Sequence, residues 1–580
     1  MSLSYERLPV VEVRDPRTIV ENQRQYAVLR SGSQVTMKQW TTTSVSQSSI
    51  QFSCPPPSGK IFVDRKVYIT LPIRLTFTGT SPPGQVLLNP NCDAPRAYPF
   101  SSSVDTLQAT INNQSVSINM ADIIQPLLHY NTDDHLCGSD YSMTPNLLDQ
   151  SQAYSQLYGT NRSPMAFYGD TLDKTMSARG GFPFTVVSNT ATSAVIDMVV
   201  CEPIFLSPFY FGKHNDSAFY NVTTMDFNIT FLGNAGFRMW SHDAVSGPGT
   251  TITGISWQFN NFISPPFTYT YANQPVMNFT YITPNETQVL PYDVPITYPY
   301  FDITRYPTDS GNAYAPGDSD VIPSNNIQLN SIPRRIYIWC RERNADLYST
   351  CANPDTYFQI NNINIQFENK NGLLASASKR HLYEMCVKNH CKMTWAQWSG
   401  ESMYHESGPF SSAPSVVGPG TIMCIEFATD IGLDSLEAPG RLGSYMLLVQ
   451  ANVRNVSNRS IVPTLYICVV SEGTFTIQGL GASSTNIGVI SSEDILNARM
   501  QPGVNYYDVE DINGGNFWSG LVNFGKDVGK RIWQGLKKWD NRASKTLDYL
   551  MDDVAPKVIK HMASGEGVLH RAALRHRMRH

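Results

Sequence analysis

Apolar and polar residues alternate with a period of two along many short segments of this chain. The longest segment is 67–78, and shorter ones lie at 225–231, 363–367 and 447–453, with turns rich in proline and glycine between them. Successive side chains of a strand point to opposite faces, so this period predicts strands with one buried face. Pro72 lacks an N–H and predicts a bulge or a sheet edge in the first segment. Many such strands predict an all-β fold, built as a sandwich or a barrel.

Two segments predict helices, and each follows a pair of strands. Residues 121–130 follow strands at 107–118, and residues 372–390 follow strands at 357–367, with a double asparagine in each strand pair. The offset between the two sets is close to 250 residues. This repetition indicates an internal duplication: two β-domains, each with a helix-bearing insertion at the same stage.

These patterns divide the chain into five parts. A polar N-terminal arm (1–34) precedes the first β-domain (35–265), and the proline-rich stretch at 263–275 marks the junction with the second β-domain (266–480). The strand pattern then stops, which predicts a linker at 481–515. Residues 516–580 form a basic tail with a helical pattern.

The apolar residues of the tail recur at spacings of three and four, which predicts one face of a helix. This face and the tryptophans beside it consist of Phe517, Trp518, Leu521, Phe524, Val528, Ile532, Trp533, Leu536 and Trp539. Four glycines within the segment would each destabilise the helix by up to about 1 kcal/mol in water, so it should form against a partner or an interface. The pattern suits an interfacial membrane helix, and equally a helix docked in a groove on the body or on a partner subunit.

The composition narrows the class of protein. Charged residues make up 16% of the 580 residues and aromatic residues 11%, which disfavours a disordered chain. The scarcity of Ala, Glu, Lys and Leu likewise disfavours a coiled coil. The net charge of −5 conceals an asymmetry, because residues 516–580 carry 13 Lys/Arg against 6 Asp/Glu, a net of +7, and residues 1–515 carry −12. An acidic body with a basic tail predicts two parts with different partners.

The sequence has no phosphate-binding loop, no nucleophile elbow and no zinc-protease motif, so we predict a non-enzymatic protein without catalytic, cofactor-binding or metal-binding residues. Asp318 and Asp320 could ligate calcium, but the Gly and Glu of a full calcium loop are missing, which favours a solvated turn. Zinc-finger spacing is likewise absent around the best metal-like cluster, which favours a buried structural role for His381, Cys386, His390 and Cys391.

Targeting signals are not expected either. The ten cysteines are spread widely and several lie in apolar strand segments, which favours reduced, buried thiols. Glu6 and Arg7 stand where a signal peptide would begin its apolar stretch, and no run approaches the 18 apolar residues of a membrane span.

Three strings resemble the double jelly-roll major capsid proteins, the lineage of adenovirus hexon and of the capsid proteins of virophages and Polinton-like viruses. They are residues 34–40 (QVTMKQW), 63–69 (VDRKVYI) and 203–211 (PIFLSPFYF). The likeness is greater to the virophage and Polinton-like members, because the long tower loops of hexon have no counterpart here. The resemblance implies two tandem jelly-roll β-sandwiches with short helices and a C-terminal helical tail.

The resemblance also implies a function and partners. It implies a homotrimer whose six jelly rolls form a pseudo-hexagonal capsomer in the icosahedral shell of a double-stranded DNA virus. The protein would be made in the cytoplasm or nucleus of the host cell and located in the virion, with neighbouring capsomers, penton proteins and minor capsid proteins as partners. A surface with few charges suits this role, because large desolvated contacts tolerate few unpaired charges.

In adenovirus-like systems a cysteine protease cleaves structural proteins after short strings that contain glycine. Two strings match here, 512–515 (INGG) before Asn516 and 477–480 (IQGL) before Gly481. The first falls where the linker meets the tail, so the resemblance implies cleavage between Gly515 and Asn516 by a viral cysteine protease.

The tail looks like the membrane-lytic helix of adenovirus internal protein VI. Our hypothesis is that it is released or exposed inside the particle and acts on an entry membrane. Its arginine-rich end could touch nucleic acid, although a solvated basic end is the commoner explanation.

Two other classes of function remain open on the residues alone. One is a carbohydrate-binding β-sandwich, such as a lectin or a virion attachment protein, which would bind glycans saturably and form no shells. The other is an enzyme on a jelly-roll scaffold such as a cupin. That scaffold needs a clustered His/Glu metal set, and cupin spacing is absent from His129, His135, His214 and His242.

Overall fold

A computed structural model of the chain describes most of residues 34–495. The gaps within this range are 89–92, 132–183 (apart from 145, 148 and 149), 210–217, 243–249, 260–261, 265–268, 272–273, 285–294, 404–415, 435, 489, 492 and 494. The predictions for the N-terminal arm, the end of the linker, the Gly515–Asn516 cleavage site and the whole tail therefore lie outside the described residues.

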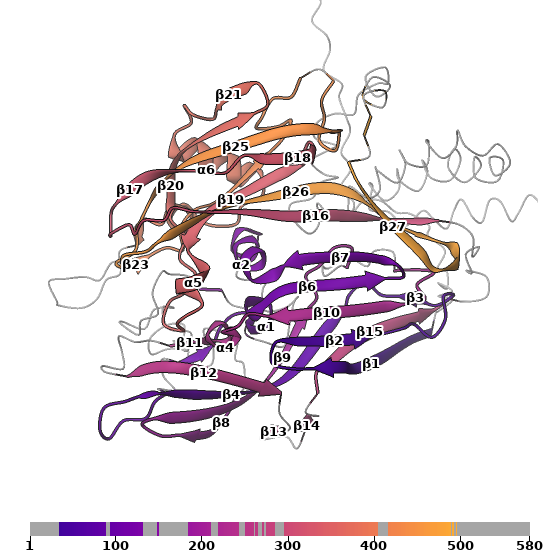
Figure 1. The fold of residues 1–580 in the computed structure, drawn as a ribbon, viewed down its shortest axis with the longest axis vertical. Coiled ribbons are helices and arrows are strands. Elements are labelled where there is room, and N and C mark those ends of the chain that lie inside the picture. Colours follow the sequence, from indigo (N-terminus) through magenta and orange to yellow (C-terminus); the bar gives the residue numbers. More distant parts are fainter. Residues whose placement is uncertain are drawn as a thin grey trace, which may run out of the picture.

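The N-terminal half forms a sandwich of two antiparallel sheets (Figure 1). One sheet has the order β1-β15-β4-β9-β8 and the other the order β2-β10-β6-β7, with β1 crossing from the first to the second. Two further strands pair with β15 and β4, respectively: β3 (Phe62–Val63) and β12 (Thr251–Phe259). The main strands are β1 (Gln34–Val45), β2 (Ser49–Ser53), β4 (Tyr68–Thr80), β6 (Val104–Ile111), β7 (Gln114–Asn119), β8 (Phe184–Asn189), β9 (Ser193–Pro203), β10 (Met225–Phe231) and β15 (Val276–Thr283).

The C-terminal half forms a second sandwich. One sheet has the order β16-β26-β19-β24 with β27 added on β26, and the other the order β17-β25-β20-β21 with β18 also on β25. The strands are β16 (Ile296–Asp309), β17 (Ser319–Pro323), β18 (Ile327–Ser331), β19 (Arg335–Glu342), β20 (Gln359–Phe367), β21 (Lys370–Leu373), β24 (Ile422–Glu426), β25 (Leu442–Arg454), β26 (Pro463–Gln478) and β27 (Ala482–Ile487).

The two sandwiches share one strand order. We number eight main strands of each sandwich along the chain. In the first sandwich β3, β8 and β12 are left out, and in the second β18 and β27 are left out. In both sandwiches one sheet then runs 1-8-3-6 and the other 2-7-4-5. This interleaved order is that of a jelly roll. The prediction of an all-β chain with two tandem jelly-roll sandwiches and few helices is therefore confirmed.

The helices predicted by the duplication occupy equivalent places. Helix α2 (Met120–Asn131) follows the β6–β7 hairpin, and α6 (Lys379–Lys388) follows the β20–β21 hairpin. The two asparagine pairs are not equivalent, however. Asn112 has a left-handed φ of 54° in the β6–β7 turn, whereas Asn361 and Asn362 lie inside β20 at a register shift against β25.

The boundary between the sandwiches lies later than the predicted junction at residues 265 and 266. Strand β15 begins after that junction, yet it pairs with β1 and β4 and so closes the first sandwich. The proline-rich stretch itself contains a small hairpin of β13 (Phe262–Ser264) and β14 (Tyr269–Tyr271). The predicted junction is wrong because its proline content reflects a connection within the first sandwich.

Inward-facing residues of both sandwiches merge into one buried apolar cluster that extends from Ile50 to Ile477. In β10 the residues alternate strictly between buried and exposed, as the period of two predicts. Pro72 lies inside β4 between two segments with different partners. The pairing of β4 with β15 ends at Thr70 of β4, and its pairing with β12 begins at Ile73 of β4. The residue without an N–H therefore falls at a break between two partner strands.

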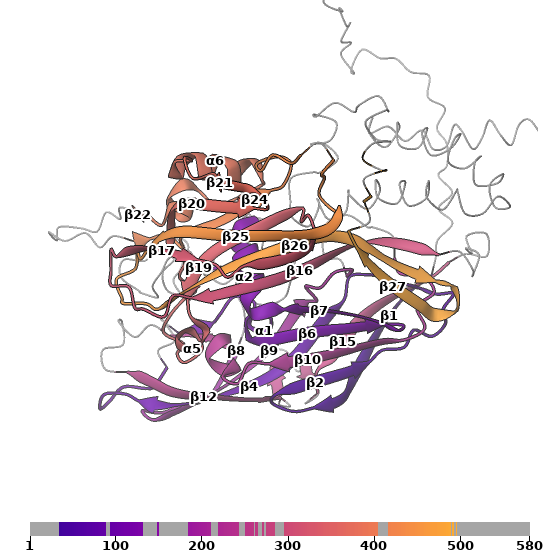
Figure 2. The same cartoon turned by 45° about the horizontal axis from the view of Figure 1, so that its top comes forward.

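Four helices lie between the sandwiches (Figures 1 and 2). They are α2 and the shorter helices α1 (Pro99–Ser103), α4 (Ala235–Met239) and α5 (Asn344–Leu347). None of the helices in the described residues is long and apolar enough to cross a membrane. Other short elements in the described residues are α7 (Trp395–Ser399), the 3-10 helix Gly479–Gly481, β5 (Ala94–Pro95), β11 (Trp240–Ser241), β22 (Ser402–Met403) and β23 (Val416–Val417).

Candidate functional site

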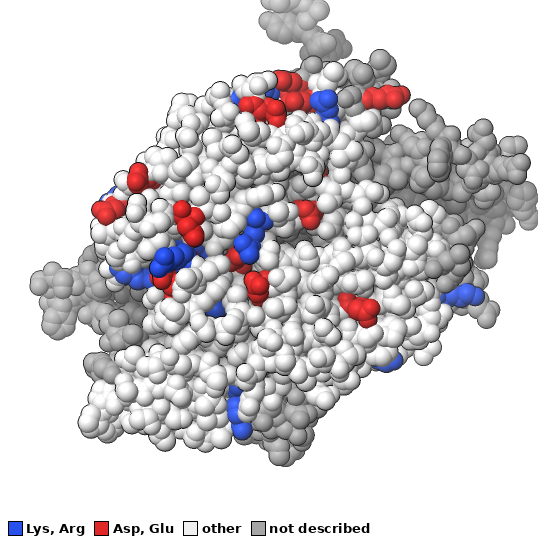
Figure 3. Space-filling view, in the orientation of Figure 1, with Lys and Arg blue, Asp and Glu red and all other residues white. Residues whose placement is uncertain are grey.

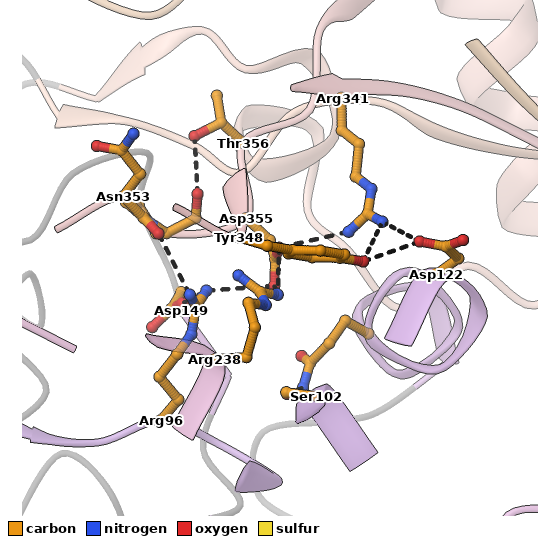
Figure 4. Close-up of polar contacts among 12 residues, drawn as sticks. Arg96, Ser102, Asp122, Asp149, Arg238, Arg341, Tyr348, Asn353, Asp355 and Thr356 are labelled. Carbon is orange, nitrogen blue, oxygen red and sulfur yellow. Dashed lines mark hydrogen bonds and ion pairs between the residues drawn. The ribbon is translucent and has the colours of Figure 1, made fainter. Parts of the chain in front are cut away.

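The most concentrated chemistry in the described part of the chain lies at the junction of the two sandwiches (Figure 4). Asp122 stands in the first turn of α2, where the partial positive charge of a helix N-terminus favours a carboxylate. Its side chain is buried, and within the described residues it contacts charged and polar side chains of the second sandwich. Arg341 Nη2 lies 2.6 Å from Asp122 Oδ1, and Arg305 Nε lies 2.8 Å from Oδ2.

Two uncharged groups complete the shell around Asp122. Asn344 Nδ2 donates to Oδ1 at 3.0 Å, and the hydroxyl of Tyr348 donates to the same atom at 2.9 Å. Asn344 is the first residue of α5 and Tyr348 is its C-cap residue. This short helix therefore positions two hydrogen-bond donors for a carboxylate of the other sandwich. The described contacts of the Asp122 carboxylate thus come from the second sandwich.

Asp355 forms the reciprocal arrangement. This buried carboxylate of the second sandwich accepts two hydrogen bonds from Arg238 Nη2, at 2.8 and 3.0 Å, and one from Arg96 Nη2 at 3.3 Å. Arg238 and Arg96 both belong to the first sandwich. Arg341 Nη1 lies 3.6 Å from the same carboxylate and so connects the two acidic centres.

Electrostatics follow from this geometry. Burial by itself raises the pKa of Asp355, but Arg238, Arg96 and Arg341 outweigh it and hold the pKa well below its usual range. The ring of Tyr348 lies beside Arg238 and Arg341, with centroid distances of 5.3 and 6.0 Å. We name the set Arg96, Asp122, Arg238, Arg341, Tyr348 and Asp355 the junction cluster.

The equivalent helices of the two sandwiches also meet. The hydroxyl of Tyr130 in α2 donates to the carbonyl oxygens of Cys386 and Asn389 at the end of α6, at 2.8 and 3.1 Å. In return, the backbone N–H of Lys392 donates to the carbonyl of Tyr130 at 2.8 Å. Donors from one sandwich therefore reach carbonyl groups at a helix end of the other, where the last turn of a helix leaves carbonyls free; the Cys386 carbonyl also accepts the N–H of Cys391.

A third contact involves the β26–β27 hairpin. Its strand β27 reaches the β6–β7 turn of the first sandwich, where the N–H of Ser483 donates to Asn113 Oδ1 at 2.7 Å. Asn112 Nδ2 donates to Ser483 Oγ at 3.1 Å. The left-handed conformation of Asn112 thus presents this turn to the last strand of the second sandwich.

These contacts make the junction a structural joint. The carboxylates of the junction cluster are buried and engaged by arginines of the opposite sandwich, an arrangement that positions domains and has no access for a substrate. Asp149 extends the joint toward the first sandwich, with its carboxylate 3.7 Å from Arg96 Nη2.

The cluster predicted to be buried and structural, His381, Cys386, His390 and Cys391, is buried only in part. Cys386 and Cys391 are buried, and His381 lies on the exposed first turn of α6, where its ring contacts Ser378. In the residues that the structure describes, no group of three or more His, Cys, Asp or Glu is arranged to hold a metal ion. Asp318 and Asp320 are exposed and accept hydrogen bonds from the backbone of the surrounding turn.

The eight described cysteines are all buried, as predicted. Burial raises the pKa of the Cys391 thiol to about 12 and that of Cys386 further. Both thiols therefore stay protonated at neutral pH and act as small apolar groups.

One of the two candidate protease strings, residues 477–480, lies in the described part of the chain. Ile477 is buried and pairs with Ile296 on one side and Ser483 on the other, and Gly479–Gly481 form a 3-10 turn at the tip of the β26–β27 hairpin. A protease needs an extended, exposed segment, so the string at 477–480 is closed to it. The Gly515–Asn516 site and the apolar face from Phe517 to Trp539 lie outside the described residues.

A surface pocket of about 240 Å³ lies on the outer face of β2, β6 and β10. Its polar lining includes Gln51, Gln108, Asp226 and Asn228. The rings of Phe52 and Phe227 are buried beneath it, so this pocket presents polar groups without an exposed aromatic platform of the kind that stacks on sugars.

The junction cluster was missed at the level of sequence. One signal was present: Arg341 and Glu342 end the apolar run 336–340 in a chain with few charges. A charged group in such a run needs a buried partner. That partner, Asp122, lies 219 residues away and no local pattern identifies it.

Comparison with known proteins gives consistent matches along the chain. The family model "Sputnik virophage major capsid protein 1st domain" matches residues 8–279, and "Major capsid protein V20 C-terminal domain" matches residues 303–473. The putative capsid protein V20 of Sputnik virophage is 35% identical over 563 residues, which cover 95% of this chain and 90% of that protein.

Solved structures extend this likeness. A chain in the cryo-EM structure of the Sputnik virophage aligns with a TM-score of 0.77 and 35% identity, covering 89% of this chain and 100% of that one. The major capsid protein of mavirus aligns with a TM-score of 0.65 at 14% identity, over 87% of this chain and 100% of that one. The second match bears on the fold alone.

Proposed function

The chain belongs to the virophage major capsid protein family, and on this premise we propose that three copies form a pseudo-hexagonal capsomer. As a member of this family it is a structural protein of the virion and not an enzyme. The finer assembly is our proposal: the trimer, its six-fold outline, and its contacts with neighbouring capsomers, penton proteins and minor capsid proteins in an icosahedral shell.

One observation carries the trimer proposal. Both sandwiches have the same strand order, so three copies supply six similar units around a three-fold axis. For those units to form a regular ring, the angle between the two sandwiches of a chain must be fixed. The junction cluster, the paired ends of α2 and α6, and the β27 contact supply three separate constraints on that angle.

Negative-stain electron microscopy of the purified full-length protein tests this proposal, together with its mass in solution. We expect particles with a hexagonal outline and a mass three times 64.7 kDa. Monomers with saturable glycan binding would instead support the carbohydrate-binding alternative.

The tail supports a second proposal, that a viral cysteine protease cleaves between Gly515 and Asn516 and releases a membrane-active segment. The competing string at 477–480 is built into the β26–β27 hairpin, which favours the string before Asn516 as the cleavage site. The apolar face of Phe517, Leu521, Phe524 and the following residues would then insert into an entry membrane.

Two measurements test the tail proposal. The intact mass of the polypeptide from mature particles should correspond to residues ending at Gly515, and a mass of 64.7 kDa would exclude cleavage. A peptide of residues 516–545 should release dye from vesicles, whereas inertness toward vesicles would contradict a membrane role.

A further inference from the structure

Exposed apolar residues gather where the chain leaves the second sandwich. Leu442, at the start of β25, is 59% exposed, and Ile487, at the end of β27, is 37% exposed. Gly488 packs against Leu442, since a Cβ on Gly488 would lie 2.9 Å from Leu442 Cδ2. The N–H of Ile490 donates to the carbonyl of Gly440 at 3.3 Å, which holds the departing chain beside β25.

The side chain of Ile490 adds to this surface, since a Cβ on Gly440 would lie 3.4 Å from Ile490 Cδ1. We name Leu442, Ile487 and the half-buried Ile490 the exit patch. Isolated exposed leucines are ordinary on a protein surface. The exit patch differs from isolated exposed leucines in its position. It lies beside the segment from which about 85 further residues of the chain, 496–580, continue.

The border of the exit patch is acidic. Asp434 and Glu437 share a single cation, because Lys370 Nζ lies 2.9 Å from the first and 3.9 Å from the second. Glu493 is exposed on the departing segment. Figure 3 shows acidic side chains, with basic ones among them, at the end of the molecule that carries β21 and the start of β25.

We propose that the apolar face of the tail, from Phe517 to Trp539, docks on the exit patch of its own chain before cleavage. Its aromatic and aliphatic residues match the apolar centre, and Lys526, Lys530 and Arg531 match the acidic border. A predicted helix weakened by four glycines needs such a surface in order to form.

The connection favours the same chain over another copy. Only 21 residues, 496–516, separate Ile495 from Phe517, and a random coil of this length has an average end-to-end distance of about 25 Å. A tether of this kind gives an effective concentration on the order of millimolar, so even a weak contact is occupied. Cutting the chain at Gly515 removes the tether, and the docked helix then dissociates.

This inference adds a regulatory step to the proposed function and rests on it only for the cleavage that releases the tail. While docked, the face that would enter a membrane is covered. After cleavage the same face becomes available.

Photo-crosslinking of the full-length protein tests the docking directly. A benzophenone amino acid replaces Leu442 in one variant and Val187 in the control, because Val187 is 51% exposed on β8 in the first sandwich. We expect crosslinks from position 442 to peptides of residues 516–545, within one chain when light and heavy protein are mixed. Absence of tail peptides, equal yields from position 187, or crosslinks between chains would overturn the proposal.

Limited proteolysis gives an independent measurement. The double variant Leu442→Asp/Ile487→Asp should raise the rate of tryptic cleavage at Lys526 and Lys530 at least about tenfold. The control Val186→Asp/Val187→Asp should leave it unchanged, because those residues are equally exposed but lie far along the chain from the exit patch. An unchanged rate in the first variant, with normal thermal unfolding, would contradict docking.

The outcomes separate this inference from the proposed function. If crosslinks fail while the 516–545 peptide still releases dye from vesicles, the docking is wrong and the membrane role stands. If crosslinks succeed while the peptide is inert, docking stands and the membrane role is wrong.

Discussion

Replacing Asp355 by Asn tests whether the junction cluster joins the sandwiches. The substitution keeps the size of the side chain and removes its charge, which leaves Arg238 fully buried beside Arg341 without an anion. Asp355 accepts three hydrogen bonds from arginines, and removing one partner of a buried ion pair costs about 3–5 kcal/mol. We expect the free energy of unfolding to fall by about that amount at neutral pH.

The pH dependence provides a second readout. The folded-state pKa of Asp355 lies below its value in the unfolded chain, which is about 3.9 for a free aspartate. Its contribution to stability is therefore complete above that pH and is lost as the pH falls toward the folded-state pKa. The difference between wild type and Asp355→Asn should be constant from about pH 5 to pH 7 and should shrink below about pH 4.

Urea titrations followed by tryptophan fluorescence measure this difference, because Trp240, Trp339 and Trp398 are fully buried and report on both sandwiches. The matched control is Asp346→Asn, which breaks an exposed pair with Arg343 at 2.6 Å and should leave the urea midpoint unchanged. The reasoning is refuted if Asp355→Asn loses less than about 1 kcal/mol, or if its effect does not diminish in acid.

Three further substitutions probe other parts of the fold. Burial raises the pKa of Glu202 to about 7, although Phe100 and Ser101 of α1 donate hydrogen bonds to its carboxylate. The stability that Glu202 contributes is therefore complete below about pH 4.5 and is lost as the pH rises to 7. Glu202→Gln should remove this pH dependence from the free energy of unfolding measured in urea titrations. Gly420→Ala should destabilise the protein by at least about 1 kcal/mol in thermal unfolding, because φ is 111° and the new Cβ would lie 2.0 Å from the Tyr357 carbonyl; no loss would contradict that contact. Tyr130→Phe removes the hydroxyl that donates to the carbonyls of Cys386 and Asn389, of which the first keeps the N–H of Cys391, and should cost about 1–2 kcal/mol. Faster hydrogen exchange in α6 is the expected local signature, and unchanged exchange would count against the helix-end contact.

Local patterns were sufficient for much of the fold. The alternation at 67–78 predicts β4, and the two hairpin–helix pairs predict α2 and α6 at equivalent stages. These features depend on neighbouring residues, whose periodicity records which face is buried. The Asn361–Asn362 pair shows the limit, because the same dipeptide forms a turn in one sandwich and a strand interior in the other.

Long-range pairing was beyond such patterns. The place of β15 in the first sandwich depends on Gln34–Thr41, which lie more than 200 residues earlier. The pairing of Asp122 with Arg341 depends in the same way on how two folded sandwiches meet. Neither contact leaves a periodic trace in the sequence, because only one residue of each pair lies in any local window.

The reciprocal burial of Asp122 and Asp355 has a consequence for inheritance. Asp122 pairs with Arg341 and Arg305 of the second sandwich, and Asp355 pairs most closely with Arg238 of the first, so a change of Arg238 or Arg341 is harmful unless the opposite half changes with it. A recombinant chain that takes its halves from two diverged viruses would combine buried carboxylates and arginines that were selected for different partner residues. The two jelly rolls should therefore be transmitted as one genetic unit, although their common strand order makes each look like a separate module.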